Sequence, residues 1–332
     1  MMKRLILIFL LLTSLFQPEV SGRDRFKEFC LKADTFLIKR YFKITYDTNY
    51  IYRPPTKWAV LARYNLSGAT IDSRGNKEDL VGRIHASAAY KSTISFTASY
   101  LGNDLSITFN PGGLIGWYKD YEFNLNQYYN RMGVDFIYQK ANDFKGWTQQ
   151  GDEEKKHFSE HRISMRTVNV NFYYAFNYRR FSYPAAFCVA YTQKRSAGSF
   201  MLGGSFLWQR LHIWEDSNLD IEDTKLKVAN VAVGAGYGYN FVLPKQWLIH
   251  VSGLPSIIIY SHAHRWSNEE ERIMKYHFPE FIVTGRAAIT HTFGRYFIGA
   301  TAVYNFTNLG KSEHLEIRHS KWRVRTFIGF KF

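Results

Sequence analysis

The feature that most constrains this chain is a regular alternation of side-chain character along several long stretches. In residues 226–241, one set of alternate positions is apolar or aromatic, and the other holds mainly asparagine, glycine and small residues. The same two-residue period runs through residues 166–178 and 322–332. Because side chains of a β-strand point alternately to opposite faces, this period predicts long strands with one apolar and one polar face.

Strand length separates two architectures that share this period. The alternating stretches are longer than the roughly five or six residues of a typical globular strand. A strand that crosses a membrane at a tilt needs roughly nine to eleven residues. The composition agrees, since 23 Tyr, 27 Phe and 8 Trp accompany 23 Gly and only 8 Pro, as suits a barrel with aromatic girdles. We therefore expect an all-β fold, an antiparallel transmembrane β-barrel, rather than a soluble sandwich.

Connections between the expected strands alternate in length when they are counted back from the C-terminus. The long ones are residues 308–320, 261–277, 214–225 and 141–164, and the short ones are residues 294–295, 243–246, 130–131 and 102–104. Outer-membrane barrels place long loops outside and short turns in the periplasm, and bacterial single-chain barrels have even strand numbers. We expect a barrel of 12 or 14 strands whose C-terminus is periplasmic.

The N-terminus predicts export. A basic start at residues 3–4 precedes an apolar run, residues 5–16, and small residues follow at 20–22. This arrangement is typical of a signal peptide, since the apolar run is too short to span a bilayer comfortably. We expect residues 1–22 to be a cleaved signal peptide and residues 23–332 to form the barrel; the alternative is a buried N-terminal helix.

The last expected strand ends the chain with an apolar face. Ile328, Phe330 and Phe332 occupy this face, with arginine, glycine and lysine opposite. Such an ending resembles the terminal signal of outer-membrane barrels, so we expect these residues to be an assembly signal. An exposed apolar edge would be an aggregation hazard in a soluble protein. The expected partners are the barrel assembly machinery and the lipid and glycolipid of the cell outer membrane.

One segment breaks the alternation of connections. Residues 179–198 join two expected strands at the periplasmic end, where a short turn would be enough. Pro184, followed by Ala185 and Ala186, favours the start of a short helix, although the alternation after Ala186 leaves a strand as the alternative. Irregular backbone cannot face hydrocarbon. We therefore expect the segment to fold inward as a plug, with its basic residues pairing with lumen carboxylates.

Three pieces of the sequence resemble an uncharacterised family of Gram-negative proteins, a domain of unknown function whose members look like outer-membrane barrels. The pieces are residues 46–51, 119–124 and 181–199. The family-like residues of the segment are Phe181, Ser182, Pro184, Phe187, Gln193, Arg195, Ser196 and Gly198. The resemblance implies a fold and an outer-membrane location, and it implies no activity, substrate or catalytic residue.

Charged residues also fall on the polar faces of expected strands. They are Arg63, Glu122, Asp135, Glu280, Arg286, Arg323 and Arg325. One interpretation is an ion-pair network that fills a closed barrel. The other is a basic constriction that favours anionic solutes. The formal net charge of +15 comes from scattered residues, and we expect no nucleic-acid partner for an exported protein.

The sequence offers weak candidates for chemistry. Ser261, His262 and His264, with glutamates nearby, contain the residue types of a hydrolase, but no pattern fixes their geometry. His262 and His264 share a strand face and, with His277, are candidate metal ligands. Loop histidines are far commoner, so no metal site is predicted. Cys30 and Cys188 are too few for a cysteine-based metal site, and one disulfide or two thiols are both open.

A cofactor is not expected, because no glycine-rich loop opens a helix. Arg272, Lys275 and Arg318 of the expected outer loops are candidates for contact with glycolipid phosphates. The sequence predicts a non-enzymatic outer-membrane barrel that acts as a channel, passive transporter or envelope scaffold. The alternative is an outer-membrane hydrolase that acts on envelope lipid. Substrate and oligomeric state are left open.

Overall fold

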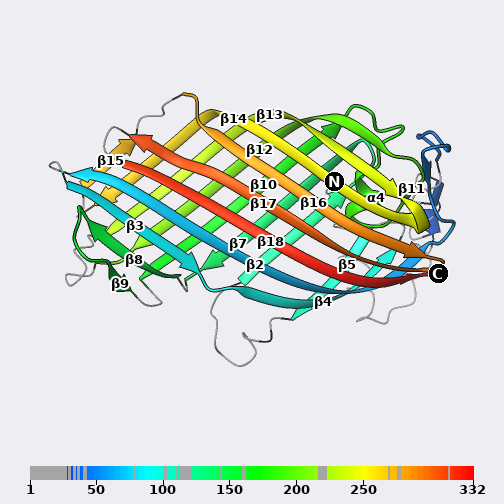
Figure 1. Ribbon diagram of the computed structural model, residues 1–332, viewed down its shortest axis with the longest axis horizontal. Helices are drawn as coiled ribbons and strands as arrows, with labels where there is room; N and C mark the ends of the chain where they lie inside the picture. Colours follow the sequence, from blue (N-terminus) through cyan, green and yellow to red (C-terminus); the bar gives the residue numbers. More distant parts are fainter. Residues whose placement is uncertain are drawn as a thin grey trace. The chain divides into compact units, whose positions relative to one another are not determined.

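The computed structural model describes residues 43–77, 80–100, 103–109, 111, 121–142, 144–158, 162–215, 223–267, 270–274, 278–312 and 315–332, with six single residues between 28 and 39. The chain divides into two compact units, Met1–Thr45 and Tyr46–Phe332. The second unit is an antiparallel β-sheet fold with a short helix, α4 (Tyr183–Phe187), and a 3-10 turn, η2 (Pro244–Gln246) (Figure 1). In the described part, no helix has both the length and the apolar character needed to cross a membrane.

The central sheet pairs most strands in chain order. Its successive members are β6 (Tyr121–Tyr128), β7 (Met132–Ala141), β10 (Ile163–Ala175), β12 (Ala197–Ile213), β13 (Thr224–Leu243), β14 (Trp247–Ser267), β16 (Phe281–Phe293), β17 (Tyr296–Ser312), β18 (Leu315–Lys331) and β2 (Trp58–Lys77). The last strand of the chain therefore lies beside one of the first, as the red and blue ribbons in Figure 1 show.

Shorter strands complete this sheet beyond β2. β3 (Leu80–Ala88) and β4 (Lys91–Tyr100) pair with successive halves of β2, so they share one position in the sheet. Further pieces are β5 (Asn103–Phe109) on β4, β8 (Phe144–Gln150) on β3, β9 (Lys156–Phe158) on β8, and β15 (Glu270–Met274) on β14. Among the described residues, the sheet contains 16 strands. Some of them lie end to end at one position of the sheet, so the number of positions is smaller than the number of strands.

The two faces of the strands carry the side chains that alternation predicts. In β13, Val233, Tyr237 and Phe241 are exposed, whereas Asn230 and Asn240 are fully buried. The same division holds in the second half of β10, where Asn171 is buried and Phe172 is exposed, and in the C-terminal half of β18. A soluble protein normally shows the reverse, since large apolar residues bury and amides stay exposed. The predicted apolar and polar faces are therefore confirmed for these parts of the strands. Towards the other end of the strands the division is reversed, since Met165 is buried and Arg166 is exposed.

The turns separate the two ends of the sheet. Short connections follow β6, β13 and β16, as predicted, at residues 129–131, at η2 and at residues 294–295, where Gly294 has a φ of 62°. We call this the tight-turn end; it also holds Phe332, which exchanges backbone hydrogen bonds with Trp58 of 2.9 and 3.1 Å. The opposite end is the long-hairpin end.

Three of the four predicted long loops are shorter than expected, whereas β12 ends at Ile213 and β13 begins at Thr224, as the predicted loop 214–225 requires. Pairing of β17 with β18 continues to Ser312 and Leu315, inside the expected loop 308–320, and β14 and β15 pair within the expected loop 261–277. Residues 141–164 contain β8 and β9. In these extensions the alternation is reversed: inward residues such as Phe144 and Ile317 are apolar and buried, and outward ones such as Arg318 are polar and exposed. The outward apolar face that marks strands in the sequence therefore stops while backbone hydrogen bonding goes on.

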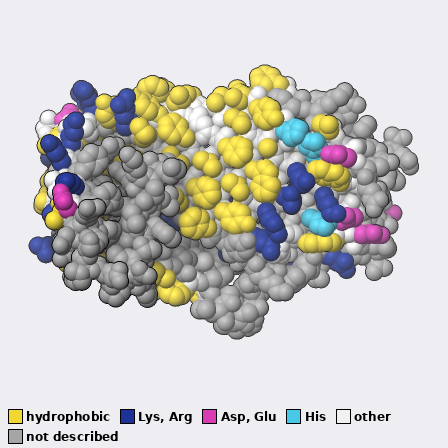
Figure 2. Space-filling view, turned by 180° about the vertical axis from the view of Figure 1, so that it is seen from behind, with side chains coloured by type: hydrophobic (Ala, Val, Ile, Leu, Met, Phe, Trp, Pro, Cys, Tyr) yellow, Lys and Arg dark blue, Asp and Glu magenta, His cyan; other side chains and the backbone are white. Residues whose placement is uncertain are grey.

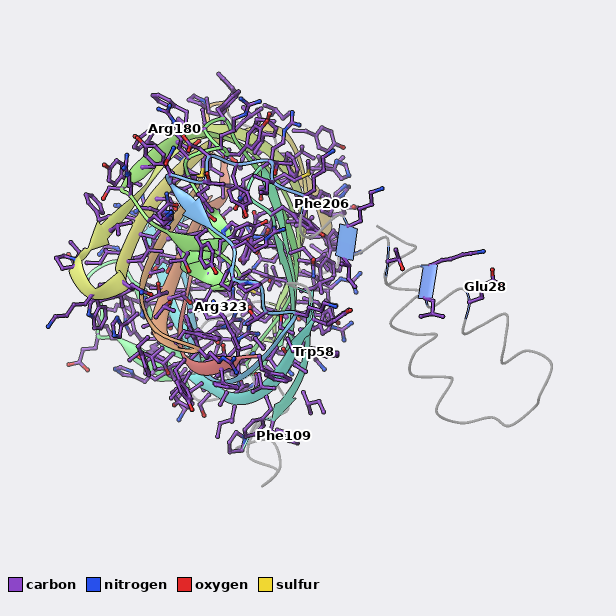
Figure 3. All side chains as sticks on the ribbon, turned by 90° about the vertical axis from the view of Figure 1, so that its right-hand side faces the viewer. Glu28, Trp58, Phe109, Arg180, Phe206 and Arg323 are labelled. Carbon is purple, nitrogen blue, oxygen red and sulfur yellow. The ribbon has the colours of Figure 1, made fainter. Side chains whose placement is uncertain are left out.

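The sheet curves back on itself and encloses its polar face. The Lys321 ammonium of β18 donates a 2.6 Å hydrogen bond to the Gln139 amide oxygen of β7, although β7 and β18 are not neighbours in the sheet. Figure 3, which looks from the tight-turn end, shows Phe109 and Phe206 on the outside of the curved ribbon and Arg323 inside. We refer to the enclosed space as the interior.

Candidate functional site

Segment 179–198 leaves the wall of strands and enters the interior at the tight-turn end. It forms α4, with Pro184 in its first turn, and all five residues of the helix are buried. The helix ends at Cys188, and Val189 adopts a φ of 52°. A valine in this left-handed conformation does not continue a helix or a strand. The predicted short helix is confirmed; the chain then forms only the two-residue strand β11 (Thr192–Gln193), which pairs with β1 (Ile51–Tyr52).

A buried glutamine holds this irregular segment together. The Gln193 amide oxygen accepts a 2.9 Å hydrogen bond from the Ser182 backbone N–H, and its amide nitrogen donates to the carbonyl of Arg180 at 2.6 Å. Asn240 of β13 donates to the carbonyl of Ser182 at 2.9 Å. These bonds satisfy backbone groups that lack a strand or helix partner in a dry environment. Two of the family-like residues, Ser182 and Gln193, thus fix the segment against the sheet.

Aromatic rings pack α4 against the inner face of the sheet. The Tyr183 ring stacks on Phe187 at 4.8 Å and lies 4.4 Å from the Tyr173 ring of β10. His250 of β14 lies 5.1 Å from the rings of both Tyr183 and Phe187. Burial is the largest effect on the Tyr183 hydroxyl and raises its pKa, so that the phenol stays neutral. Phe181 is also fully buried. The segment is thereby anchored by its apolar members.

A buried ion pair lies beside these rings. The Arg286 guanidinium of β16 donates to the Asp135 carboxylate of β7, and the two side chains are 7% and 4% exposed. Tyr128 of β6 donates to the other carboxylate oxygen at 2.5 Å. The Arg286 guanidinium also lies 5.8 Å from the centre of the Tyr183 ring. This cluster therefore joins the helix to the β6–β7 hairpin and to β16, which is distant from that hairpin in sequence.

The other predicted lumen charges whose side chains the structure describes lie on inward positions. Arg63 donates to the Thr97 hydroxyl at 3.1 Å, and Arg325 donates to the Asn65 amide oxygen at 2.6 Å. Glu280 is buried, and Arg323 is half-buried. The side chain of Glu122 lies outside the described residues. Residues missed in the sequence are Tyr128, Gln139, His250 and Lys321, of which Lys321 continues the alternation of Arg323 and Arg325.

The basic residues that flank α4 do not enter the interior. The Arg180 guanidinium lies 3.6 Å from the Asp47 carboxylate at the exposed rim. Arg195 lies over the Tyr50 ring, with 5.9 Å to its centre, and is exposed. The expectation that they pair with lumen carboxylates is therefore wrong. Leaving a guanidinium in water avoids the large desolvation cost of burying it, while the apolar helix gains from burial.

The remaining family-like residues lie at this rim. Ser196 is exposed, and its hydroxyl accepts a 2.9 Å hydrogen bond from the Val242 backbone N–H. Gly198 lies in β12, where a Cβ atom would come within 2.1 Å of the Tyr237 hydroxyl. Close approach of that tyrosine explains why this position holds glycine.

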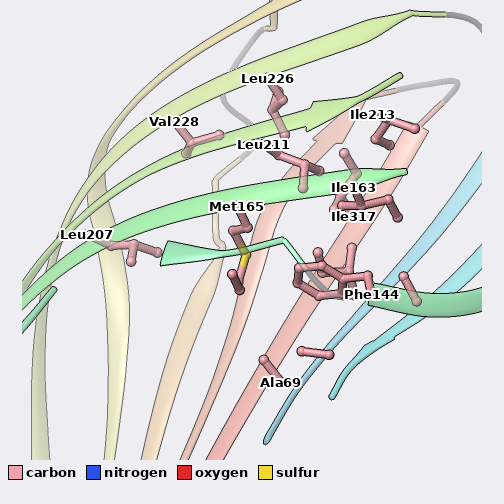
Figure 4. Close-up of a cluster of buried hydrophobic side chains, with 14 of the residues drawn as sticks. Ala69, Phe144, Ile163, Met165, Leu207, Leu211, Ile213, Leu226, Val228 and Ile317 are labelled. Atoms are coloured by element: carbon pink, nitrogen blue, oxygen red, sulfur yellow. The ribbon is translucent and has the colours of Figure 1, made fainter. Parts of the chain in front are cut away.

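The long-hairpin half of the interior is filled by apolar side chains. They come from strands all around the sheet, and Figure 4 shows Phe144, Met165, Leu207 and Ile317 meeting there. Beside Tyr183 and Arg286, a small cavity of about 20 Å³ has room for about one water molecule. In the described part, the interior is thus packed at both ends rather than lined for a passing solute.

The candidate hydrolase residues point in opposite directions. The Ser261 hydroxyl faces inward and donates to the Asn230 amide oxygen at 2.8 Å. His262 and His264 face outward, with 2.6 Å between their Nε2 atoms, and His264 Nδ1 lies 2.6 Å from the Glu271 carboxylate. These residues therefore do not form the serine–histidine arrangement of the hydrolase alternative. The part of the chain that is described holds no group of three His, Cys, Asp or Glu side chains arranged for a metal ion.

The sequence relationship agrees with this architecture. Residues 45–332 match the family described as "Domain of unknown function (DUF4421)". The chain belongs to this family. The match covers the whole sheet, segment 179–198 and the C-terminal strand, so the predicted resemblance is confirmed. No curated protein matches this DUF4421 chain.

Solved structures that resemble the chain come from outer-membrane proteins. One is the outer membrane protease OmpT from Escherichia coli, with a TM-score of 0.41 and 8% identity over 88% of this chain and 100% of that one. Another is the outer membrane protein OprG from Pseudomonas aeruginosa, with a TM-score of 0.31 and 10% identity over 83% and 97%. The translocator domain of autotransporter NalP from Neisseria meningitidis has a TM-score of 0.33 and 8% identity over 92% and 98%. Likenesses this distant say nothing of activity.

Proposed function

We propose that this chain is a non-enzymatic outer-membrane β-barrel with a closed bore, which serves as an envelope scaffold. The observation that supports this function is the packed interior, filled by apolar side chains at one end and by α4 at the other. A porin-type channel needs a polar, water-filled lumen. The two packed clusters favour a closed barrel over the channel and the passive transporter, the other two functions that the sequence predicts.

Closure of the barrel follows from the cost of open edges in lipid. β5 and β6 are the outermost strands at the tight-turn half of the sheet, and they follow one another in the chain. An open edge would leave N–H and C=O groups unpaired in hydrocarbon, at several kcal/mol for each group. We therefore pair β5 with β6. The barrel then has twelve positions, occupied by β2, β3 with β4, β5, β6, β7, β10, β12, β13, β14, β16, β17 and β18.

The exposed aromatic residues support a membrane location. Many lie towards the tight-turn end, namely Trp58, Phe176, Phe200, Tyr237, Phe241, Phe293, Tyr296 and Phe332. Aromatic girdles mark the interfaces of membrane barrels. The tight-turn end would face the periplasm and the long-hairpin end the outside. The expected signal peptide, residues 1–22, lies outside the described residues. This proposal includes export of the chain and recognition of Ile328, Phe330 and Phe332 as an assembly signal by the assembly machinery.

Conductance measurements test the closed bore. The purified protein, refolded and inserted into a planar bilayer, should give no steady single-channel conductance. A variant with Phe181, Tyr183 and Phe187 changed to alanine should also stay closed, because the apolar cluster around Phe144 still blocks the other half. Stable open channels in the unmodified protein would contradict the proposal and favour the channel function.

Thiol accessibility tests the placement of α4 as a plug. In a Cys30→Ser, Cys188→Ser background, a cysteine at Ala186, which is 0% exposed, should react slowly with a bulky polar maleimide until the protein is denatured. A cysteine at the exposed position Lys194 is the matched control and should react fast in the folded protein. Equally fast reaction at both positions would show that α4 lies open at the periplasmic rim.

A second candidate is an enzyme that acts on envelope lipid. The hydrogen-bonded series Glu271, His264 and His262 on the outward face is the observation that favours it. A carboxylate that orients a histidine base is one part of a nucleophilic site, but Ser261 points the other way. Loss of intact phospholipid from vesicles that hold the refolded protein, abolished by His264→Gln, would favour this candidate over the scaffold.

A further inference from the structure

A row of basic residues crosses five neighbouring strands on the outward face. Cross-strand pairing sets Lys140 opposite Arg166, Arg166 opposite Arg210, Arg210 opposite Lys227, and Lys227 opposite His264. These positions point outward, since the residues before and after them in β10 and β12 are buried. We call these five residues the basic row. It lies near the long-hairpin end.

The lysine and arginine residues of the basic row have no ion-pair partner among the described carboxylates. Like charges that face each other directly on adjacent strands repel and destabilise the pair. Among the described carboxylates, Glu271 lies 2.6 Å from His264, and Asp223 is engaged by His212 and Lys225 at 2.7 and 3.2 Å. An anion from outside the chain would relieve this repulsion.

The row lies directly at the edge of the apolar surface. Two residues closer to the tight-turn end, the next paired positions are Tyr138, Val168, Trp208, Ala229 and His262, and the following ones are Phe136, Val170, Phe206, Val231 and Tyr260. A step of two residues along a strand is about 7 Å. Figure 2 shows lysine, arginine and histidine side chains gathered beside a broad apolar area on one face.

Aromatic rings accompany the row, as they do at membrane interfaces. The Arg210 guanidinium lies 5.8 Å from the centre of the Trp208 ring, and the Lys227 ammonium lies 4.5 Å from that of Trp266. Tryptophan is enriched at the level of lipid headgroups. These pairs hold the cations at the depth where headgroup phosphates begin.

We propose that the basic row binds the phosphate group of a lipid headgroup in the outer leaflet. This inference rests on the proposed membrane location, and it assigns residues beyond the loop arginines that the sequence indicates. Adjacent strands lie about 4.8 Å apart, so one phosphate placed between two strands can contact cations from both. Arg166 and Arg210 offer planar forks suited to bidentate contact with phosphate, and Lys140 and Lys227 flank them as point charges.

Lipid retention tests this inference. The refolded protein is held in detergent micelles that contain phosphatidic acid, with phosphatidylcholine as the reference lipid, and bound lipid is measured by native mass spectrometry. The unmodified protein should retain phosphatidic acid in preference to phosphatidylcholine. The Arg166→Gln/Arg210→Gln variant should retain less phosphatidic acid, by a factor of about ten or more, because charge-assisted hydrogen bonds to phosphate are lost. Arg166→Lys/Arg210→Lys keeps the charge and should recover part of the binding.

Matched controls separate the outcomes. Arg179→Gln/Arg295→Gln removes two exposed arginines at the tight-turn end and should leave retention unchanged. The inference would be overturned by any of three results: an equal loss of bound phosphatidic acid in this control, no loss in the Arg166→Gln/Arg210→Gln variant, or complete displacement of the lipid by millimolar inorganic phosphate. Insertion into bilayers is measured in parallel. A protein that does not insert contradicts the proposed membrane function, whereas one that inserts without lipid preference contradicts only the basic row's role.

Discussion

Replacement of Arg286 by methionine should lower the free energy of unfolding by about 3–5 kcal/mol, the cost of leaving one charge of a buried pair without its partner. The Asp135 carboxylate would keep only the Tyr128 hydroxyl, at 2.5 Å, from the present cluster. Methionine fills a similar volume and is flexible, so the main loss is electrostatic. Urea unfolding of the refolded protein, followed by the shift of its folded band in electrophoresis, measures the change.

Two further variants give this prediction its control. Adding Asp135→Asn to Arg286→Met removes both charges and should recover part of the lost stability, because replacing a whole buried pair costs less than breaking it. Arg318→Met breaks the exposed pair with Glu316, where the arginine side chain is 56% exposed, and should cost no more than about 1 kcal/mol. The prediction is contradicted if the double variant has a lower free energy of unfolding than Arg286→Met alone. In that case the two charges do not stabilise each other.

The faces of the strands could be predicted from the sequence because the information is local. Each outward residue, such as Val233, is flanked by inward ones whose polarity or small size differs, and the pleat alone fixes this relation. The helix in segment 179–198 could be predicted for the same reason, since Pro184 sets the start of its own turn. Both predictions depend on residues within a few positions of each other.

The cross-interior contacts could not be predicted, because they depend on the curvature of the whole sheet. Arg286 and Asp135 are 151 positions apart, and Lys321 and Gln139 are 182 apart. Alternation shows that these residues point inward, but it does not show which of them meet. The packing of Phe144 and Met165 into one cluster was missed for the same reason. The sequence therefore predicts the strands of this protein better than the contacts between side chains in its interior.

The lengths of the hairpins were mispredicted for a different reason, because side-chain alternation does not record backbone pairing. Strand pairing in β17 and β18 continues past the outward apolar face to Ser312 and Leu315. There the alternation is reversed, since Ile317 is buried and Arg318 is exposed. Hydrogen bonding needs only backbone groups, so it leaves no trace in side-chain alternation. The apolar period thus reports the extent of the outward apolar band rather than the full length of the strands.

Val233→Arg should cost about 2–4 kcal/mol of folding free energy in lipid, the penalty for an arginine near the midplane on the outside of a membrane barrel. Val233 is 46% exposed and lies mid-strand in β13, on the outward face. In a soluble protein, the same substitution at an exposed site would change stability by no more than about 0.5 kcal/mol. Refolding into phosphatidylcholine vesicles over a urea series measures the difference between the variant and the unmodified protein.

Leu243→Arg is the matched control for the membrane depth of this effect. Leu243 lies on the same face of β13, at its tight-turn end, and is 44% exposed. An arginine there reaches the interface, so its cost should fall to about 0–1 kcal/mol. Asn230→Arg is not a suitable control, because Asn230 is fully buried in a packed interior and the larger side chain has no room. Equal and small costs at Val233 and Leu243 would show that the apolar face of the sheet does not meet lipid.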